Sequence, residues 1–393
     1  MGDTQRLRVA VLSELPTPYR RPLFARLAAR PDLDLRVLYY TRTESDRDWD
    51  IARVEGDLPH EEFLPGRAWH LRRRRSLYFH WNPGIGRRLR EGRFDVVVLP
   101  GWSMPSTLAA VWTCRTRGIP YVLFSETNEL SPRPLWLRSV KRVVLRPVVG
   151  GASAWLATGS LSAAYLVRHG ARTERVRRFA NTPDVDALAA AVDAARPRRA
   201  AVRAALGIPA DVPLAVFVGR LIGAKGVETL VAAQRLLEER GSRVHTLVVG
   251  DGVLSESLRA RAANPSIRQI VFAGPRRPDE LPDVWAASDL FVLPSWHEPW
   301  GVVVNEAMAA GLPVVLSDRV GAAADLLVPG RTGHAFAAGD ARALADALSA
   351  VADDADARRR MGAEARAHVA GWGYGPSVEG FVAAVRLAAG GPA

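Results

Sequence analysis

The chain has 393 residues, a net charge of +12 and a single cysteine, Cys114. A chain of this length usually divides into two domains, and one cysteine excludes an intrachain disulfide and any cluster of cysteine metal ligands. Hydrophobic residues form 48% of the chain and charged residues 24%, which is the balance of an ordinary globular protein and argues against disordered or fibrous classes.

Short apolar runs alternate with helical patterns in the first half of the chain. Near-continuous apolar strands that are each followed by a helix are typical of parallel sheets covered on both faces. The charge-free stretch 147–167 is rich in Gly, Ser and Thr, so we expect a strand and a helix start there and not a membrane-spanning helix. We expect strands at 7–15, 33–40, 94–101, 120–126 and 152–159.

The segment HLRRRRSLYFHWNPGIGRRLREGR, residues 70–93, combines an arginine run with aromatic residues. Asn82 followed by Pro83 is a typical helix start, so we expect a helix from 83. Two interpretations of 70–81 stay open. It is either a solvated loop or a peripheral contact with an anionic membrane.

The positive charge is concentrated in the first half of the chain. Residues 1–185 contain 31 Lys and Arg against 18 Asp and Glu, whereas residues 186–393 contain 22 against 23. Only the first half should therefore attract an anionic partner or surface. A few polar residues precede the first strand, without an apolar signal segment, so we expect a cytoplasmic location, with peripheral contact at the inner face of the membrane as an option.

The alternation of strands and helices resumes in the second half, after a weaker stretch near 186–205 with a Pro-Arg break. The pattern predicts two doubly wound, Rossmann-like α/β domains with parallel sheets. We expect further strands at 213–220, 244–252, 267–274, 290–295 and 312–318. The predicted domains are an N-terminal one over 1–190, a linker over 191–204, a second one over 205–371, and a C-terminal helix within 372–393 that packs back on the first.

Two cations follow the strand at 213–220. They are Arg220 and Lys225, and Lys225 is one of only two lysines in the chain. Ligands of doubly wound sheets bind beyond the carboxyl ends of the strands, where these cations would lie. Each alone is compatible with a solvated loop. Together at a strand end they suit an anionic ligand such as a diphosphate.

The densest polar cluster, WHEPWGVVVNEAMAAG, follows the strand at 290–295. HEPWG is a turn and VVVNEAMAA a helix, whose first turn offers unpaired N–H groups to an anion that Gly301 lets approach closely. Glu298 and Glu306 are eight residues apart, so both carboxylates can face one crevice and accept hydroxyls of a sugar or ribose. Each glutamate alone is equally compatible with a surface position.

These segments resemble the carboxyl domain of the retaining glycosyltransferases of family 4. The resemblance rests on GRLIGAKGVETLV, VVGDG, the long segment VFAGPRR to VVLSD, and GRTGHAF, and it covers about 212–345 strongly. FANTPDVDAL resembles the Asn-x-x-Asp segment of the family, here Asn181 and Asp184. Members have the GT-B fold, in which two Rossmann-like domains face each other across a cleft, so we expect that fold.

The resemblance implies a role for each matching residue. Arg220 and Lys225 would hold the donor diphosphate and stabilise its growing charge, Glu298 would contact the donor sugar, and these three are the catalytic candidates. Glu306 would bind ribose hydroxyls, and the base would lie near Gly274–Arg276. The implied donor site comprises Gly219, Arg220, Lys225, Gly274, Arg276, Glu298, Trp300, Gly301, Val302 and Glu306.

The first half departs from better-known family members. SELPTPYRRPLF stands where many carry a glycine-rich loop, and LPGWSMPST stands where many carry a histidine, so no catalytic histidine is assigned. Trp102 and Glu126 are expected at strand ends and are candidate acceptor contacts. Trp102 is equally compatible with core packing.

The leading hypothesis is a retaining, metal-independent hexosyltransferase that uses a nucleotide diphosphate sugar as co-substrate and needs no cofactor or metal. The basic first half favours an anionic or lipid-linked acceptor, as in cell-surface glycan or glycolipid synthesis, and the donor motifs argue against nucleic acid binding. The alternatives are glycosylation of a small secondary metabolite, a nucleotide-sugar epimerase, and a non-catalytic glycan- or nucleotide-sugar-binding protein.

Overall fold

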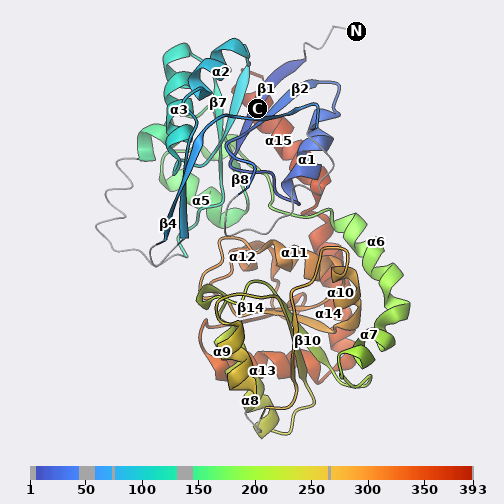
Figure 1. Ribbon diagram of the computed structural model, residues 1–393. Helices are drawn as coiled ribbons and strands as arrows, with labels where there is room; N and C mark the ends of the chain where they lie inside the picture. Colours follow the sequence, from blue (N-terminus) through green and yellow to red (C-terminus); the bar gives the residue numbers. More distant parts are fainter. Residues whose placement is uncertain (1–5, 44–57, 73–75, 131–144, 264–266, 392–393) are drawn as a thin grey trace. The chain divides into compact units, whose positions relative to one another are not determined.

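The computed structural model describes residues 6–43, 58–72, 76–130, 145–263 and 267–391, with only the backbone described for 70–72, 76 and 77. The chain divides into two compact units. The first unit comprises residues 1–181 and 374–393, and the second comprises 182–373 (Figure 1).

The first unit is built on a seven-stranded sheet whose paired strands are all parallel. Its strand order is β3-β2-β1-β6-β7-β8-β9. Alternate residues of β1 enter different cores, since Val9 and Val11 pack on one face of the sheet and Ala10 and Leu12 on the other. The strands are β1 (Leu7–Ser13), β2 (Leu33–Tyr39), β3 (Glu61–Phe63), β6 (Val96–Pro100), β7 (Tyr121–Ser125), β8 (Ala154–Ala157) and β9 (Val176–Arg178).

Helices cover both faces of this sheet. Residues from α2, α3 and α5 join one core, and residues from α1 and α15 join the other. The described helices of the first unit are α1 (Arg20–Ala28), α2 (Ile85–Glu91), α3 (Pro105–Arg117), α5 (Ser160–Arg168), the short η2 (Thr173–Arg175) and α15 (Tyr374–Ala388), and residues 145–150 are helical as well.

The last helix, α15, belongs to the first unit although it follows the whole second unit in sequence. It packs against β8 and β9 and lies beside α1, as Figure 1 shows in red and blue. The Tyr374 hydroxyl donates a hydrogen bond to the Tyr19 carbonyl at 2.8 Å, and Arg386 forms an ion pair with Asp32 at 2.6 Å. The first contact holds the end of the loop that precedes α1, and the second holds the segment between α1 and β2.

The second unit contains a six-stranded parallel sheet in the order β12-β11-β10-β13-β14-β15. Its strands are β10 (Leu214–Val218), β11 (His245–Val249), β12 (Ile270–Gly274), β13 (Leu290–Leu293), β14 (Val314–Ser317) and β15 (Gly333–Phe336). Its described helices are α6 (Val185–Ala195), η3 (Arg196–Arg198), α7 (Arg199–Ala205), η4 (Gly223–Lys225), α8 (Val227–Glu239), α9 (Ser255–Ala262), α10 (Leu281–Ala287), α11 (Val302–Ala309), α12 (Ala323–Leu326), α13 (Ala341–Ala352) and α14 (Ala355–Ala370).

The segment expected to be a linker, 191–204, is helical and part of the second unit. Both α6 and α7 pack on α10. Arg203 on α7 is 1% exposed, contacts Asp289 at 2.5 Å and donates to the Ala287 carbonyl at 2.8 Å. The boundary between the units therefore falls at 181/182, earlier than 190, because these helices bury their side chains in the second unit.

All ten strands expected from apolar runs are present within their predicted ranges, and β8 and α5 occupy 147–167 as expected. None of the described helices has both the length and the apolar character needed to cross a bilayer. The helix expected from 83 is α2, which begins at Ile85.

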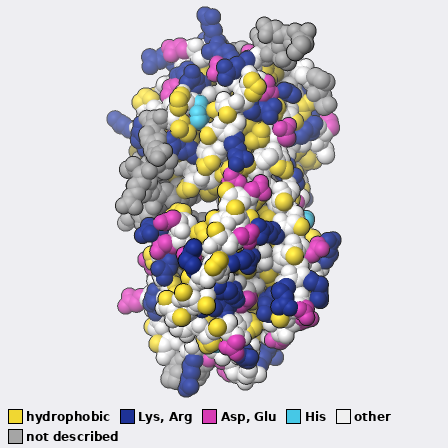
Figure 2. Space-filling view, turned by 90° about the vertical axis from the view of Figure 1, so that its right-hand side faces the viewer, with side chains coloured by type: hydrophobic (Ala, Val, Ile, Leu, Met, Phe, Trp, Pro, Cys, Tyr) yellow, Lys and Arg dark blue, Asp and Glu magenta, His cyan; other side chains and the backbone are white. Residues whose placement is uncertain are grey.

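Residues 67–72 and 76–81 form two paired antiparallel strands and not a loop. The strands are β4 (Arg67–Arg72) and β5 (Ser76–Trp81), with Trp69 opposite Phe79. Of the arginine run, positions 73–75 lie outside the described residues. On the face drawn in Figure 2, Lys and Arg side chains are spread over the surface with Asp and Glu side chains among them.

Candidate functional site

The strand orders place one switch point in each sheet. In the second unit β10 pairs with both β11 and β13, and the chain order reverses between β10 and β13. In the first unit the reversal falls between β1 and β6. Loops that leave the carboxyl ends of such strands diverge to opposite faces of the sheet and leave a ligand crevice between them.

Lys225 and Glu298 meet at the switch point of the second unit. Lys225 follows β10 and Glu298 follows β13, and the ammonium group donates to the Glu298 carboxylate. Both side chains are mostly buried, with 18% and 14% of their surface exposed. Because an ammonium has three N–H donors, Lys225 can bind a further anion while it keeps this ion pair.

Arg220 lies on the same loop and is exposed. Its guanidinium has no hydrogen bond or ion pair with any of the described residues. An unpaired guanidinium two residues beyond the end of β10 is available to bind a phosphate in a bidentate manner.

Gly226 lets this loop pass close to β13. Its φ is 65°, and a Cβ at this position would lie 2.0 Å from the Pro294 carbonyl oxygen. Only glycine combines the left-handed conformation with so close an approach. The loop that carries Arg220 and Lys225 is therefore held against the strand end that leads to Glu298.

The turn HEPWG leads into α11. Gly301 has a φ of 98° and directly precedes Val302, the first residue of the helix. Trp300 is buried, and its indole N–H donates to the Asn305 side-chain oxygen at 3.0 Å, so the side chain anchors the turn. The first N–H groups of α11 lack partners within the helix and favour negative charge.

Glu306 lies in the middle of α11 and is partly buried. Burial raises the pKa of its carboxyl group to about 7. Its side chain accepts no hydrogen bond from any of the described residues. A dehydrated carboxylate without donors is stabilised by ligand hydroxyl groups.

Three further candidates lie at strand ends in the same sheet. Gly219 directly follows β10, and its N–H donates to the Val249 carbonyl at 3.0 Å. Gly274 ends β12 with a φ of 73°, and Arg276 in the next loop is about one third exposed and lies 3.9 Å from Glu280. The described residues hold no group of three or more His, Cys, Asp or Glu side chains placed to bind a metal ion.

A cavity of about 300 Å³ lies at the switch point of the first unit. Glu126, which follows β7, lines it. Trp102 is not among the lining residues. It is 9% exposed and stacks on Tyr165 with ring centroids 5.8 Å apart, so its side chain fills the core.

Sequence reasoning missed Arg20, which lines this cavity from the first turn of α1. The segment SELPTPYRRPLF lacks the glycine-rich loop of many family members and carries Arg20 instead. Arg20 follows the end of β1 by seven positions, so the strand-end rule applied to β1 indicates it.

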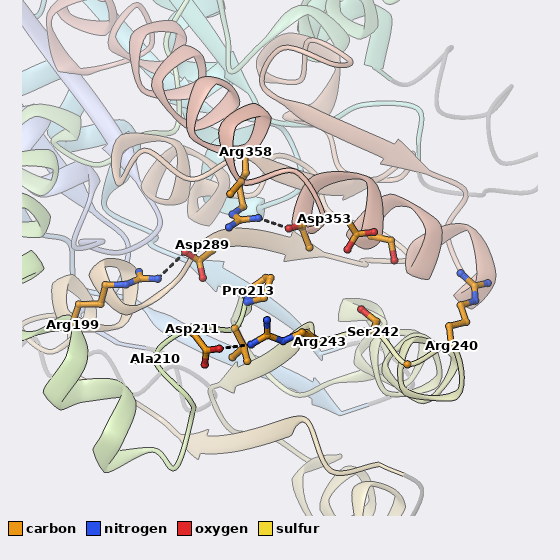
Figure 3. A pocket seen from close by; sticks show the side chains of 15 residues that line it. Arg199, Ala210, Asp211, Pro213, Arg240, Ser242, Arg243, Asp289, Asp353 and Arg358 are labelled. Carbon is orange, nitrogen blue, oxygen red and sulfur yellow. Dashed lines mark hydrogen bonds and ion pairs between the residues drawn. The ribbon is translucent and has the colours of Figure 1, made fainter.

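A second cavity, of about 710 Å³, lies at the opposite edge of the second sheet, where the strands begin (Figure 3). Pro213 and Asp289 on its wall directly precede β10 and β13. Arg199 contacts Asp289 at 2.7 Å and Arg243 pairs with Asp211, so carboxylates on the same wall neutralise these arginines. The carboxyl ends of the strands remain the better candidate site.

Two family models match the chain, one on each unit. The model described as "Glycosyl transferase 4-like domain" matches residues 5–182, and the model described as "Glycosyl transferases group 1" matches residues 198–368.

Curated relatives carry the name D-inositol 3-phosphate glycosyltransferase. The protein from Nocardia farcinica is 36% identical over 192 residues, which are 47% of this chain and 42% of the relative. The protein from Arthrobacter sp. is 32% identical over 305 residues, 74% of this chain and 70% of the relative. The chain spans less than half the length of several of the curated relatives it matches, including those from Nocardia farcinica and Streptomyces scabiei.

Solved structures show the same fold. HepE of Anabaena, crystallised in complex with UDP, aligns with 98% of this chain and 98% of its own at a TM-score of 0.70 and 18% identity. The lipopolysaccharide outer core galactosyltransferase WaaB aligns with 96% of this chain and 99% of its own at a TM-score of 0.67 and 15% identity. Together with the family models and the relative matched over 70% of its length, these findings show that the chain belongs to the family 4 glycosyltransferases and has the GT-B fold.

Proposed function

We propose that this protein is a retaining glycosyltransferase that transfers a hexose from a nucleotide diphosphate sugar to an acceptor hydroxyl group. The observation that carries the proposal is the convergence of Arg220, the Lys225–Glu298 ion pair and the start of α11 at the switch point of the second sheet. Unpaired positive charge beside a carboxylate fits a ligand that joins a diphosphate to hydroxyl-bearing rings.

The diphosphate would lie between Arg220, Lys225 and the N–H groups near Trp300–Val302. These groups stabilise a negative charge that grows as the bond between the sugar and the phosphate breaks. Because the leaving group keeps its charge on oxygen atoms that these donors contact, the roles of Arg220 and Lys225 in catalysis do not require a metal ion.

The two rings of the donor would lie on either side of the diphosphate. Glu298 would accept a hydroxyl hydrogen bond from the sugar while it keeps its contact with Lys225, and Glu306 would accept hydrogen bonds from the ribose. Gly219, Gly274 and Arg276 would contact the nucleoside. UDP-sugars are the first donors to test, because HepE of Anabaena was crystallised with UDP and with UDP-glucose.

The acceptor would bind in the first unit and present one hydroxyl group. The relatives' name specifies an inositol phosphate acceptor and that of WaaB a lipopolysaccharide, so phosphorylated polyols and cell-surface glycans are the classes to examine. We propose that a phosphate oxygen of the donor takes the acceptor proton as the acceptor attacks the face that the leaving group occupies, which retains the anomeric configuration.

Slow hydrolysis of the donor in the absence of acceptor tests the reaction and its stereochemistry together. UDP-α-glucose and UDP-α-galactose would be incubated with the wild type and with Glu298→Gln, and the released sugar would be followed by proton NMR. We expect UDP and the α-anomer to appear first with the wild type and both to be strongly reduced with the variant.

Other outcomes separate the competing functions. Initial release of the β-anomer would overturn retention. Conversion of UDP-glucose to UDP-galactose would indicate an epimerase, and tight binding of the donor without any turnover, even with candidate acceptors, would indicate a binding protein.

A further inference from the structure

The cavity of the first unit is lined by polar groups from three loops that follow strands of one sheet. The end of β1 and the loop after it contribute Ser13, Glu14 and Thr17, the loop after β6 contributes Ser103, the loop after β7 contributes Glu126 and Thr127, and α1 contributes Arg20. A volume of about 300 Å³ is at the lower end of the range of small-molecule sites and suits a ligand of the size of one sugar or polyol.

Arg20 has an unusual hydrogen-bonding state for a buried arginine. Its side chain is 8% exposed, and among the described residues its guanidinium makes one hydrogen bond, from Nη2 to Glu126 Oε1 at 3.3 Å. The neighbouring Arg21 is comparably buried but binds Glu61 through two nitrogen atoms at 2.8–3.1 Å. A guanidinium has five N–H donors, so Arg20 has donors to spare on the wall of the cavity.

The guanidinium of Arg20 is held in place by two aromatic rings. It lies 4.3 Å from the centroid of Phe124 and 4.5 Å from that of Phe179. Burial lowers the pKa of Arg20 from its usual value, and the nearby Glu126 carboxylate opposes this effect. A charge that is dehydrated, fixed in orientation and only weakly paired is better stabilised when a second anion binds.

We propose that this cavity binds an anionic group of the acceptor on Arg20, so that the acceptor is a hydroxyl-rich molecule carrying a phosphate or a carboxylate. The proposal rests on the proposed function for the role of its ligand. The anion would take the free N–H groups of Arg20. The ligand hydroxyls would donate to Glu14 and contact Thr17 on the same wall.

Glu126 has a second part in this arrangement. Its side chain is 41% exposed and holds Arg20 through a single long contact, so it can turn toward solvent when the ligand anion arrives. It competes with that anion for the guanidinium. Removal of its charge should therefore strengthen anion binding, whereas removal of the Arg20 charge should abolish it.

Isothermal titration calorimetry of the full chain without donor tests this, with glucose 6-phosphate, glucuronate, glucose and glucosamine as probes. We expect the two anions to bind the wild type at least about tenfold more tightly than glucose, the effect of one charged hydrogen-bonded pair. Comparison of glucose 6-phosphate with glucuronate shows whether the cavity binds a phosphate or a carboxylate more tightly. Glu126→Gln should tighten the binding of the anions, and Arg20→Gln and Arg20→Lys should weaken it, the latter because an ammonium lacks the planar fork.

Two control variants test whether the anion binds in the cavity of the first unit. Glu129→Gln removes a carboxylate of similar exposure that pairs with Arg168 and does not line the cavity, so it should leave anion binding unchanged. Arg220→Ala should also leave it unchanged, because loss of anion binding in that variant would place the anion at the donor diphosphate site.

The proposal is overturned if the anions bind no more tightly than glucose, if glucosamine is the preferred probe, or if Glu126→Gln weakens anion binding. The Glu126 variant keeps the test decisive even if the Arg20 variants fail to fold. Titration of the same wild-type sample with UDP separates a failure of the acceptor site from a failure of the donor site. UDP binding without anion binding contradicts only the acceptor assignment.

Discussion

Lys225 and Glu298 form an ion pair that joins the loops after β10 and β13 at the switch point of the second sheet. The pair is mostly buried, whereas Arg220 on the same loop as Lys225 is exposed and forms no ion pair with any of the described residues. One lysine therefore does two things. It donates a hydrogen bond to the Glu298 carboxylate, and it presents its remaining N–H donors to a ligand.

Lys225→Ala should weaken the binding of a nucleotide diphosphate at least about tenfold, because a charged hydrogen bond to phosphate is lost. It should also lower the stability of the protein, since Glu298 would remain buried without its partner. Calorimetric titration with UDP and urea unfolding measure the two effects. Arg235→Ala removes an exposed cation on α8 that pairs with Glu239 and should change neither quantity appreciably.

The raised pKa of Glu306 predicts that the free energy of unfolding of the protein falls as the pH rises. Its pKa in the folded protein is about 7, above the ordinary value of 4.5, so between these values the folded state binds more protons than the unfolded state. The contribution of Glu306 to stability is therefore present below about pH 4.5 and is lost as the pH rises through 7. Glu306→Gln should remove this loss.

The measurement is urea unfolding of the wild type and Glu306→Gln at pH 5 and pH 8. The variant should gain stability relative to the wild type by up to about 3 kcal/mol between the two pH values. It should also bind UDP more weakly at pH 8, since an amide accepts ribose hydroxyls less well than a carboxylate. An equal difference in stability at both pH values would mean that Glu306 titrates normally.

Gly226→Ala should disturb the loop that carries Arg220 and Lys225. A Cβ there would meet the Pro294 carbonyl oxygen at a residue with φ of 65°, so we expect a loss of at least about 1 kcal/mol together with weaker UDP binding. Gly223→Ala is the matched control on the same loop, because a Cβ there has no heavy atom within 4 Å. If both variants melt at the same temperature, the close approach of the two loops is not required.

Arg203→Ala should destabilise the second unit by about 3 kcal/mol or more, because it removes a buried cation bonded to Asp289 and to backbone carbonyls. Arg198 lies in the neighbouring short helix η3. Arg198→Ala breaks an exposed ion pair with Asp283 and should lower the free energy of unfolding by no more than about 1 kcal/mol. Urea unfolding distinguishes the two. Equal, small effects would show that 191–204 acts as a loose connection and not as part of the unit.

The sequence was sufficient for the features that depend on local pattern. Apolar runs located the ten main strands, and the strand-end rule located Lys225 and Glu298, whose contact the structure shows. The strand pair β4–β5 was not predicted, because its mixture of arginine and aromatic residues does not show a clean alternation of apolar and polar positions. The weak alternation and the Pro-Arg break predict a linker at 191–204, and no local pattern shows that Arg203 binds buried carbonyl groups there.

In the first unit, the sequence did not show which residues line the cavity. Trp102 and Glu126 both follow strands, yet only Glu126 lines the cavity, since Tyr165 stacks on Trp102 from a distant helix. Arg20 reaches the cavity because Phe124 and Phe179, far apart in sequence, form its walls. Such contacts between remote residues leave no periodic trace in the sequence.

The most direct test of the donor site is calorimetric titration of UDP, GDP, ADP and dTDP into the wild type, Arg220→Ala and the control Arg235→Ala. We predict that one nucleotide diphosphate binds the wild type and the control equally well, and binds Arg220→Ala at least about tenfold more weakly. Unchanged binding in Arg220→Ala, or no binding of any of the four to the wild type, would contradict a donor site at the carboxyl ends of β10 and β13.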